Sequence, residues 1–140
     1  MIKIPTWFWV IAVIALIWNL LGVMAFLMHI NISPEMLASM SAEEQKLYAD
    51  TPLWSKVAFG IAVFAGAIAS IMLLMKKKLS SMIFTISLLA VLAQQFYIFF
   101  VSNTMQVLGY GQAVMPAIVI IIAVALVHFA NSCRKKRWIN

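Results

Sequence analysis

Long apolar runs, separated by short polar connections, dominate the chain. A helix that crosses the hydrocarbon core of a bilayer needs roughly 20 apolar residues, and runs of about that length occur four times. The pattern therefore predicts an all-α, integral membrane four-helix bundle that forms one domain over residues 1–140. The expected helices cover about residues 6–30, 53–75, 79–101 and 113–133, and 31–52 is the first outer loop.

The loop 31–52 carries signals for two short helices. Ser33, Pro34 and Glu35 form a helix start, with a capping serine, a proline in the first turn and an acid near the positive end of the helix dipole. Ser41 and Glu44 have the spacing of a capping box. We therefore expect this loop to fold into two short helices.

Charged residues are distributed unevenly along the chain. All acidic residues lie in the loop 31–52, whereas eight of the ten Lys and Arg residues are Lys3, 76–78 and 134–137. Cytoplasmic loops of membrane proteins carry the excess of Lys and Arg. The distribution predicts that both termini and the turn 76–78 are cytoplasmic and that the loop 31–52 faces outward.

Composition restricts the partners of the chain. It is 65% hydrophobic and 10% charged, with a mean hydropathy of +1.03. The net charge of +6 would suggest nucleic acid in a soluble protein, but here the basic residues cluster at helix ends, where anionic lipid attracts them. We expect the bilayer as partner and no nucleic acid. The first apolar run exceeds the usual core of a signal peptide, so we expect it to be a retained helix.

Few polar residues lie at membrane depth, where they face a bundle interior or a cavity. Asn19 in the first helix and Gln94 and Gln95 in the third lie at similar depth, roughly 20 Å from the inner surface. One interpretation is a structural hydrogen bond that sets the register of helices one and three, worth about 0.6 to 2 kcal/mol. The other is a polar layer that binds a solute, with Tyr97 and its neighbours Phe96, Phe99 and Phe100 as walls.

Small residues mark one face of the second helix. Ala62, Gly66 and Ser70 are spaced four apart, which lets helix backbones approach closely in lipid. We expect this face to make the tightest helix contact. We expect the hydroxyl groups of Ser70 and, in the third helix, of Thr85 and Ser87 to bond to preceding carbonyls of their own helices.

The sequence lacks the residue combinations that usually support catalysis, metal binding or proton-coupled transport. No Asp, Glu, Lys or Arg is expected at mid-membrane depth, so proton-coupled transport has no visible carrier. No nucleophile with a base and an orienting partner is recognisable, so we expect no catalytic residues and no enzyme activity. His29 and His128 fall at opposite ends of the bundle, so we expect no metal site and no cofactor. Cys133 is the single cysteine, which excludes an internal disulfide.

Three segments carry a resemblance to a known family: WNLLGV at Trp18–Val23, LLMKKK at Leu73–Lys78, and the pair Phe96–Tyr97. The chain resembles, nearly end to end, a family of small, uncharacterised bacterial four-helix inner-membrane proteins, some of which carry the label "sugar transporter". The resemblance implies a location in the bacterial inner membrane. It supplies no mechanism, and the single residue for which it suggests a functional role is Asn19.

Two functions fit these observations. The first is a structural or accessory membrane protein that acts through a membrane partner or through self-association, as the small-residue face and the absence of chemistry suggest. The second is a passive transport or binding module for a small neutral solute such as a sugar, as Asn19, Gln94, Gln95 and Tyr97 suggest. The sequence leaves both open.

Overall fold

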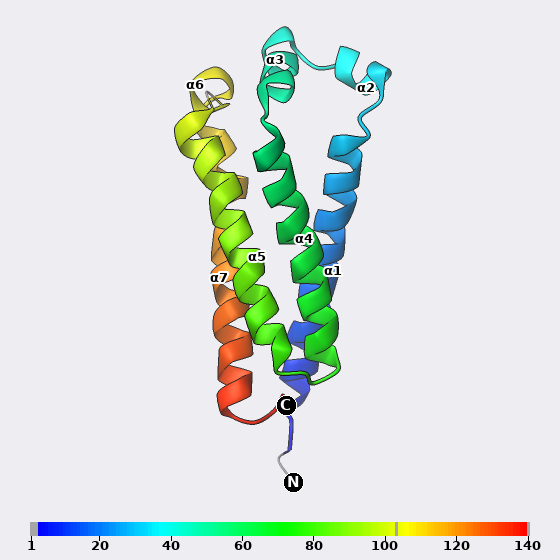
Figure 1. Ribbon diagram of the computed structural model, residues 1–140, viewed down its shortest axis with the longest axis vertical. Helices are drawn as coiled ribbons and strands as arrows, with labels where there is room; N and C mark the ends of the chain where they lie inside the picture. The colour runs from blue at the N-terminus through cyan, green and yellow to red at the C-terminus, as the bar shows by residue number, and fades with distance from the viewer. Residues whose placement is uncertain (1–2, 103, 140) are drawn as a thin grey trace.

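The computed structural model describes residues 3–102 and 104–139. In this part of the chain the secondary structure is helical, without strands, and it includes four helices long and apolar enough to cross a membrane. The all-helical architecture predicted from the sequence is confirmed. Figure 1 shows the long helices side by side as a bundle: α1 (Thr6–Ile30), α4 (Leu53–Leu74), α5 (Leu79–Phe96) and α7 (Val114–Lys135).

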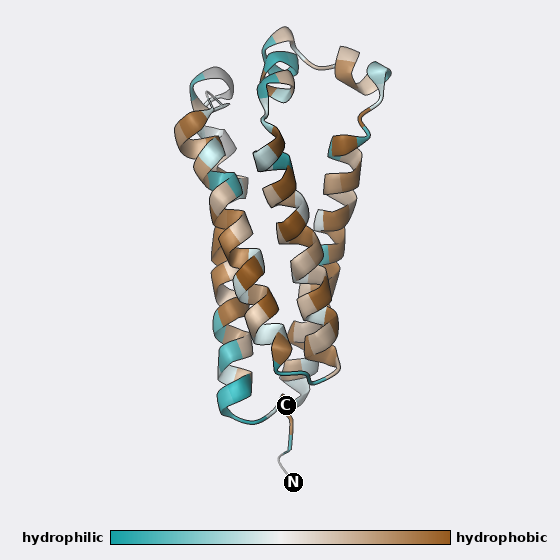
Figure 2. Cartoon of the chain, in the orientation of Figure 1, coloured by the Kyte–Doolittle hydropathy of each residue, from teal (hydrophilic) through white to brown (hydrophobic). Residues whose placement is uncertain are grey.

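The two ends of the bundle differ. Both termini and the turn between α4 and α5 lie at one end, which we call the terminal end (Figure 1). The opposite end, which we call the loop end, carries the short helices α2 (Pro34–Ala38), α3 (Ala42–Asp50) and α6 (Thr104–Leu108). Figure 2 shows hydrophilic residues gathered at both ends and hydrophobic residues along the long helices.

The two short helices predicted in the first loop are present. The Ser33 hydroxyl accepts a hydrogen bond from the Met36 amide at 3.1 Å, and the Ser41 hydroxyl accepts one from the Glu44 amide at 3.1 Å. Each serine thereby satisfies a backbone donor that the first helical turn leaves free. These caps stabilise the first turns of α2 and α3.

The third long helix departs from the prediction near the loop end. The α-helical pattern stops at Phe96, and Tyr97–Val101 form a π-helical turn, η1. The Ser102 amide accordingly bonds to the Tyr97 carbonyl, five residues back, at 2.8 Å. Such wider turns change the direction of the following side chains and are frequent at functional sites.

The connection after η1 is more than a plain turn. It contains α6 and a 3₁₀ turn, η2 (Tyr110–Ala113). Gly109 lies between them with φ of 96°, a conformation that residues with a side chain rarely adopt. The glycine therefore marks the sharp turn between two short helices.

Among the four long helices, α4 is the most buried. It packs against α1 on one side and α5 on the other, and α5 in turn packs against α7. Large side chains on α1 and α7, such as Ile14, Leu21 and Ile121, are more than half exposed. They form the apolar outer surface that a bilayer would cover.

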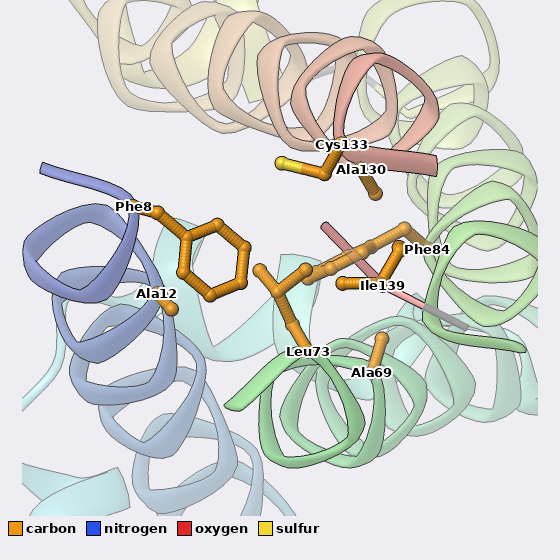
Figure 3. Close-up of a cluster of buried hydrophobic side chains, with 8 residues drawn as sticks. All are labelled: Phe8, Ala12, Ala69, Leu73, Phe84, Ala130, Cys133 and Ile139. Carbon is orange, nitrogen blue, oxygen red and sulfur yellow. The ribbon is translucent and has the colours of Figure 1, made fainter. Parts of the chain in front are cut away.

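A cluster of buried hydrophobic side chains lies at the terminal end. Side chains from all four long helices converge there, as Figure 3 shows, and Ile139 from the C-terminal segment joins them. The cluster is completed by aromatic contacts, among them Phe8 with Phe129 at 5.9 Å and Trp7 with Trp138 at 5.2 Å between ring centroids. The cluster consists of Phe8, Ala12, Ala69, Leu73, Phe84, Ala130, Cys133 and Ile139.

Candidate functional site

A cavity of about 380 Å³ lies between the four long helices, farther from the termini than the hydrophobic cluster. We call it the chamber. Its walls are largely apolar, with Trp18 and Gly22 from α1, Phe59 from α4, and Val119 and Ala123 from α7. The polar side chains that line it are those of Asn19, Ser87, Gln94 and Gln95.

Asn19 joins α1 to α4 at the wall of the chamber. Its Nδ2 donates to the Ala15 carbonyl of its own helix at 2.8 Å and to the Ser70 hydroxyl of α4 at 3.2 Å. Gly66 makes room for this amide, because a Cβ at that position would collide with the Asn19 side chain. The small-residue face and the polar residue of α1 thus form one interface.

The predicted pairing of Asn19 was therefore only half right. Asn19 does make a hydrogen bond between helices, but to α4, and the hydrogen bonds of the described residues include none between Asn19 and Gln94. The reason is packing: α4 lies between α1 and α5. The bond therefore fixes the register of α1 relative to α4.

Ser87 makes the corresponding contact between α5 and α4. Its hydroxyl donates to the Ala62 carbonyl at 2.6 Å, whereas Ser70 and Thr85 bond to carbonyls of their own helices, as expected. The expectation for Ser87 was wrong because Ala62 brings the backbone of α4 within reach. Ala62, Gly66 and Ser70 are all buried, so this face is used for packing inside the chain.

The two glutamines face the chamber from α5. Gln95 is 5% exposed, and its Oε1 has no hydrogen-bond partner among the residues that the structure describes. Gln94 is half-buried and lines the same space. A buried amide oxygen without a donor is costly, and this one borders a cavity large enough for a ligand to supply the donor.

A second cavity, of about 320 Å³, lies at the loop end beneath α3. We call it the vestibule. Thr51, Ser55, Lys56 and Thr104 line it. Tyr97 lines the vestibule rather than the chamber, and its hydroxyl donates to the Asp50 carbonyl at 3.3 Å while its ring contacts Trp54.

The aromatic walls predicted around Tyr97 are only partly in place. Phe96 and Phe100 are 55% and 77% exposed and contact each other on the outside of the bundle. The chamber takes its aromatic walls from Trp18, Phe59 and Phe84 instead. These three were missed because they look like ordinary lipid-facing or core residues in an apolar run, and only the helix arrangement brings them together.

Titratable groups do not gather into a metal site in the part of the chain that the structure describes, where no three His, Cys, Asp or Glu residues group together. His29 lines the vestibule, its ring contacts Tyr48, and its carbonyl accepts the Tyr48 hydroxyl at 2.7 Å. This bond ties α3 to the end of α1. His29 thus forms part of the polar rim of the loop end.

Comparison with known proteins adds no relative. The sequence matches no protein-family model, no curated protein and no solved structure.

Proposed function

We propose that this chain is a membrane-embedded module that binds a small, largely apolar molecule in the chamber. The supporting observation is the unpartnered oxygen of Gln95 at the wall of a cavity of about 380 Å³. Ligand sites in proteins are concave and mostly apolar, with a few polar groups that fix orientation. Gln94, Gln95 and Asn19 take that orienting role.

The ligand is less polar than a sugar, the solute named in the label that some members of the similar family carry. A sugar carries a hydroxyl on most of its carbons, and each hydroxyl buried without a partner costs about 1 to 3 kcal/mol. The chamber offers four polar side chains, and Asn19 and Ser87 already use hydrogen atoms in bonds between helices. A molecule with one or two hydrogen-bonding groups suits this lining better.

The same proposal includes a location. The basic residues at the terminal end and the acidic residues at the loop end support an arrangement with both termini in the cytoplasm. The resemblance to small bacterial proteins supports the inner membrane. In this arrangement the vestibule opens toward the outer surface.

A structural or accessory role through a membrane partner or a second copy is the other candidate. The small-residue face no longer supports it, since Asn19 and α5 cover that face inside the chain. The support comes instead from the rim of the chamber, where Leu21 of α1 and Met115 of α7 are 57% and 58% exposed. A partner helix that sealed this side would give a defined oligomer in native mass spectrometry, and a monomer in native membranes would contradict it.

A cavity-filling variant tests the binding proposal. The protein in phosphatidylcholine nanodiscs is titrated with 1-aminoanthracene, a small apolar fluorophore with one hydrogen-bonding group. We expect saturable binding that Ala123→Trp weakens at least tenfold, because Ala123 lines the chamber. Ala125→Trp is the matched control, since Ala125 lies on α7 and is exposed.

The role of the unpartnered amide has its own readout. We expect Gln95→Leu to weaken the binding of 1-aminoanthracene more than that of anthracene, which offers no hydrogen-bonding group. Equal binding of 1-aminoanthracene by the wild type, Ala123→Trp and Ala125→Trp would reject the chamber as a binding site. Far-UV circular dichroism of each variant verifies that the helices are intact.

A further inference from the structure

The chamber and the vestibule adjoin each other. Phe59 of α4 and Gln94 of α5 line both cavities. In Figure 1, α4 and α5 leave their common turn together and diverge toward the loop end. Phe59 and Gln94 therefore lie at the boundary between the two spaces, which we call the neck.

The two spaces differ in chemistry. The chamber below the neck is bounded by side chains such as Val91, Ile122 and Leu126. The vestibule above the neck is also lined in part by apolar side chains, but hydroxyl, amide and charged groups take a larger share of its lining than in the chamber, among them Thr51, Ser55 and Ser102. A molecule that fills both spaces needs an apolar chain and a polar head.

The charges of the vestibule nearly cancel. Lys56 is half-buried, and its Nζ lies over the Tyr48 ring, 5.3 Å from the centroid. Glu44 lies on the exposed rim contributed by α3, and His29 completes the titratable groups that line this space beside the two tyrosines. One cation and one carboxylate leave no net charge for an ionic head to neutralise, whereas hydroxyl groups find both donors and acceptors.

The length of the chamber restricts the chain. Phe84 lies at its inner end and Gln94 at the neck, on the same helix. The ten residue steps from one to the other correspond to about 15 Å along α5, the length of an extended alkyl chain of about ten carbons. Phe84 also belongs to the hydrophobic cluster of the terminal end, which closes the floor.

Because the two cavities adjoin and differ in lining, we propose that the ligand is a single-chain amphiphile with an uncharged, hydroxylated head. Its alkyl chain lies in the chamber, its head lies in the vestibule, and a hydroxyl near the neck donates to the unpartnered Oε1 of Gln95. This inference rests on the proposed binding function and adds the class and orientation of the ligand. It also gives a role to the buried amide of Gln95, which directly follows Gln94 at the neck.

Photolabelling tests the orientation. A 1-O-alkylglycerol with a ten-carbon chain and a diazirine on its terminal carbon is added to nanodiscs, irradiated, and its adducts are mapped by mass spectrometry. We expect labels on the floor residues Phe84 and Leu126 that an excess of unlabelled 1-O-decylglycerol removes. Labels confined to lipid-facing residues such as Ile121, or labels that competition does not reduce, would overturn the inference.

Competition tests the head. At equal chain length, we expect decylglycerol to displace the label at concentrations at least tenfold lower than decanoate or decyltrimethylammonium. Stronger competition by decanoate or by the ammonium compound would show an ionic head instead. Equal competition by all three would show that the vestibule does not select a head. Either result would overturn the inference while leaving the chamber as a binding site.

A variant of the vestibule separates the two proposals. Ser55 is 4% exposed, lines the vestibule, and takes no part in the chamber. We expect Ser55→Ala to reduce photolabelling by the alkylglycerol at least threefold without altering 1-aminoanthracene binding. Unchanged photolabelling of Ser55→Ala would contradict a head in the vestibule. If the wild type does not bind 1-aminoanthracene at all, the proposed binding function itself is rejected.

Discussion

The terminal end and the loop end of the bundle are held together by different forces. At the terminal end, Phe8 and Leu73 are fully buried, and the C-terminal segment folds back so that Ile139 is 2% exposed. At the loop end, two hydrogen bonds join separate helical segments, from the Tyr97 hydroxyl to the Asp50 carbonyl and from the Tyr48 hydroxyl to the His29 carbonyl, and aromatic contacts such as Trp54 with Tyr97 accompany them. A buried apolar cluster closes one end, and hydrogen bonds with aromatic contacts bridge the other.

This difference shows how a small bundle can contain a cavity. Interiors of proteins are close-packed, and empty space forfeits dispersion contacts. A chain of this size can lose those contacts between α1 and α7 only if the helices are fixed elsewhere. The cluster around Leu73 and the bonds of Asn19 and Ser87 supply that fixation.

Truncation of one apolar side chain at each end provides the largest contrast. Leu73→Ala should lower the free energy of unfolding by about 2 to 5 kcal/mol, because it opens a cavity in a well-packed region. Ile122→Ala, at the wall of the chamber, should cost about 1 kcal/mol, since its side chain already borders empty space. Unfolding in mixed micelles of dodecyl maltoside and dodecyl sulfate measures both. Equal losses would contradict the difference in packing.

The close contact between Gly66 and Asn19 gives the next largest effect on stability. Gly66→Ala places a methyl group against the Asn19 amide, and overpacking of this kind costs about 1 to 3 kcal/mol. Asn19→Ala removes the obstacle along with the hydrogen bond to Ser70. The double variant should therefore lose less stability than the sum of the single variants, by at least about 0.5 kcal/mol. Strict additivity would contradict the contact.

The hydrogen bond between α5 and α4 is a smaller test. Ser87→Ala should lower the free energy of unfolding by about 0.6 to 1.7 kcal/mol, the range for such bonds between helices in a membrane. Thr85→Val is the control, because Thr85 is exposed and bonds to its own helix. We expect little change from it. A comparable loss in both variants would show that Ser87 does not join the helices.

Much of the fold could be predicted because the membrane simplifies the problem. Every backbone group in the hydrocarbon must be satisfied within its own helix, so apolar length alone predicted α1 and α4 to within one residue. Cap signals at Ser33 and Ser41 were equally local and were confirmed. The π turn at Tyr97–Val101 was not predicted, since no local signal distinguishes it from an α-helical turn.

The site was harder to predict because it depends on neighbours. Depth along each helix suggested that Asn19, Gln94 and Gln95 lie at one level, and all three line the chamber, whereas Tyr97 lines the vestibule. Depth could not reveal that α4 would come between α1 and α5 and pair Ser70 with Asn19, because helix order around a bundle is set by surfaces and not by hydropathy. The vestibule was invisible for the same reason, since it combines residues of α3, α4 and α5.

The smallest expected effect concerns how each end makes its sharpest turn. The loop end uses Gly109 at φ of 96°, whereas the terminal end uses Lys76 and Arg137 at φ of 59° and 61°. A residue with a side chain is strained in the left-handed region by roughly 1 to 2 kcal/mol. The terminal end tolerates this strain where basic side chains can meet anionic headgroups.

Lys76→Gly should therefore raise the free energy of unfolding by about 0.5 to 1 kcal/mol, the strain relieved less the extra freedom of glycine in the unfolded chain. Lys77→Gly removes the same charge from the next position, where φ is not positive, and should be neutral or destabilising. Comparing the two in zwitterionic nanodiscs separates backbone strain from charge. If both variants shift the free energy of unfolding alike, the charge of this turn rather than its backbone strain sets its contribution to stability. The basic residues of the terminal end would then serve only to contact the lipid.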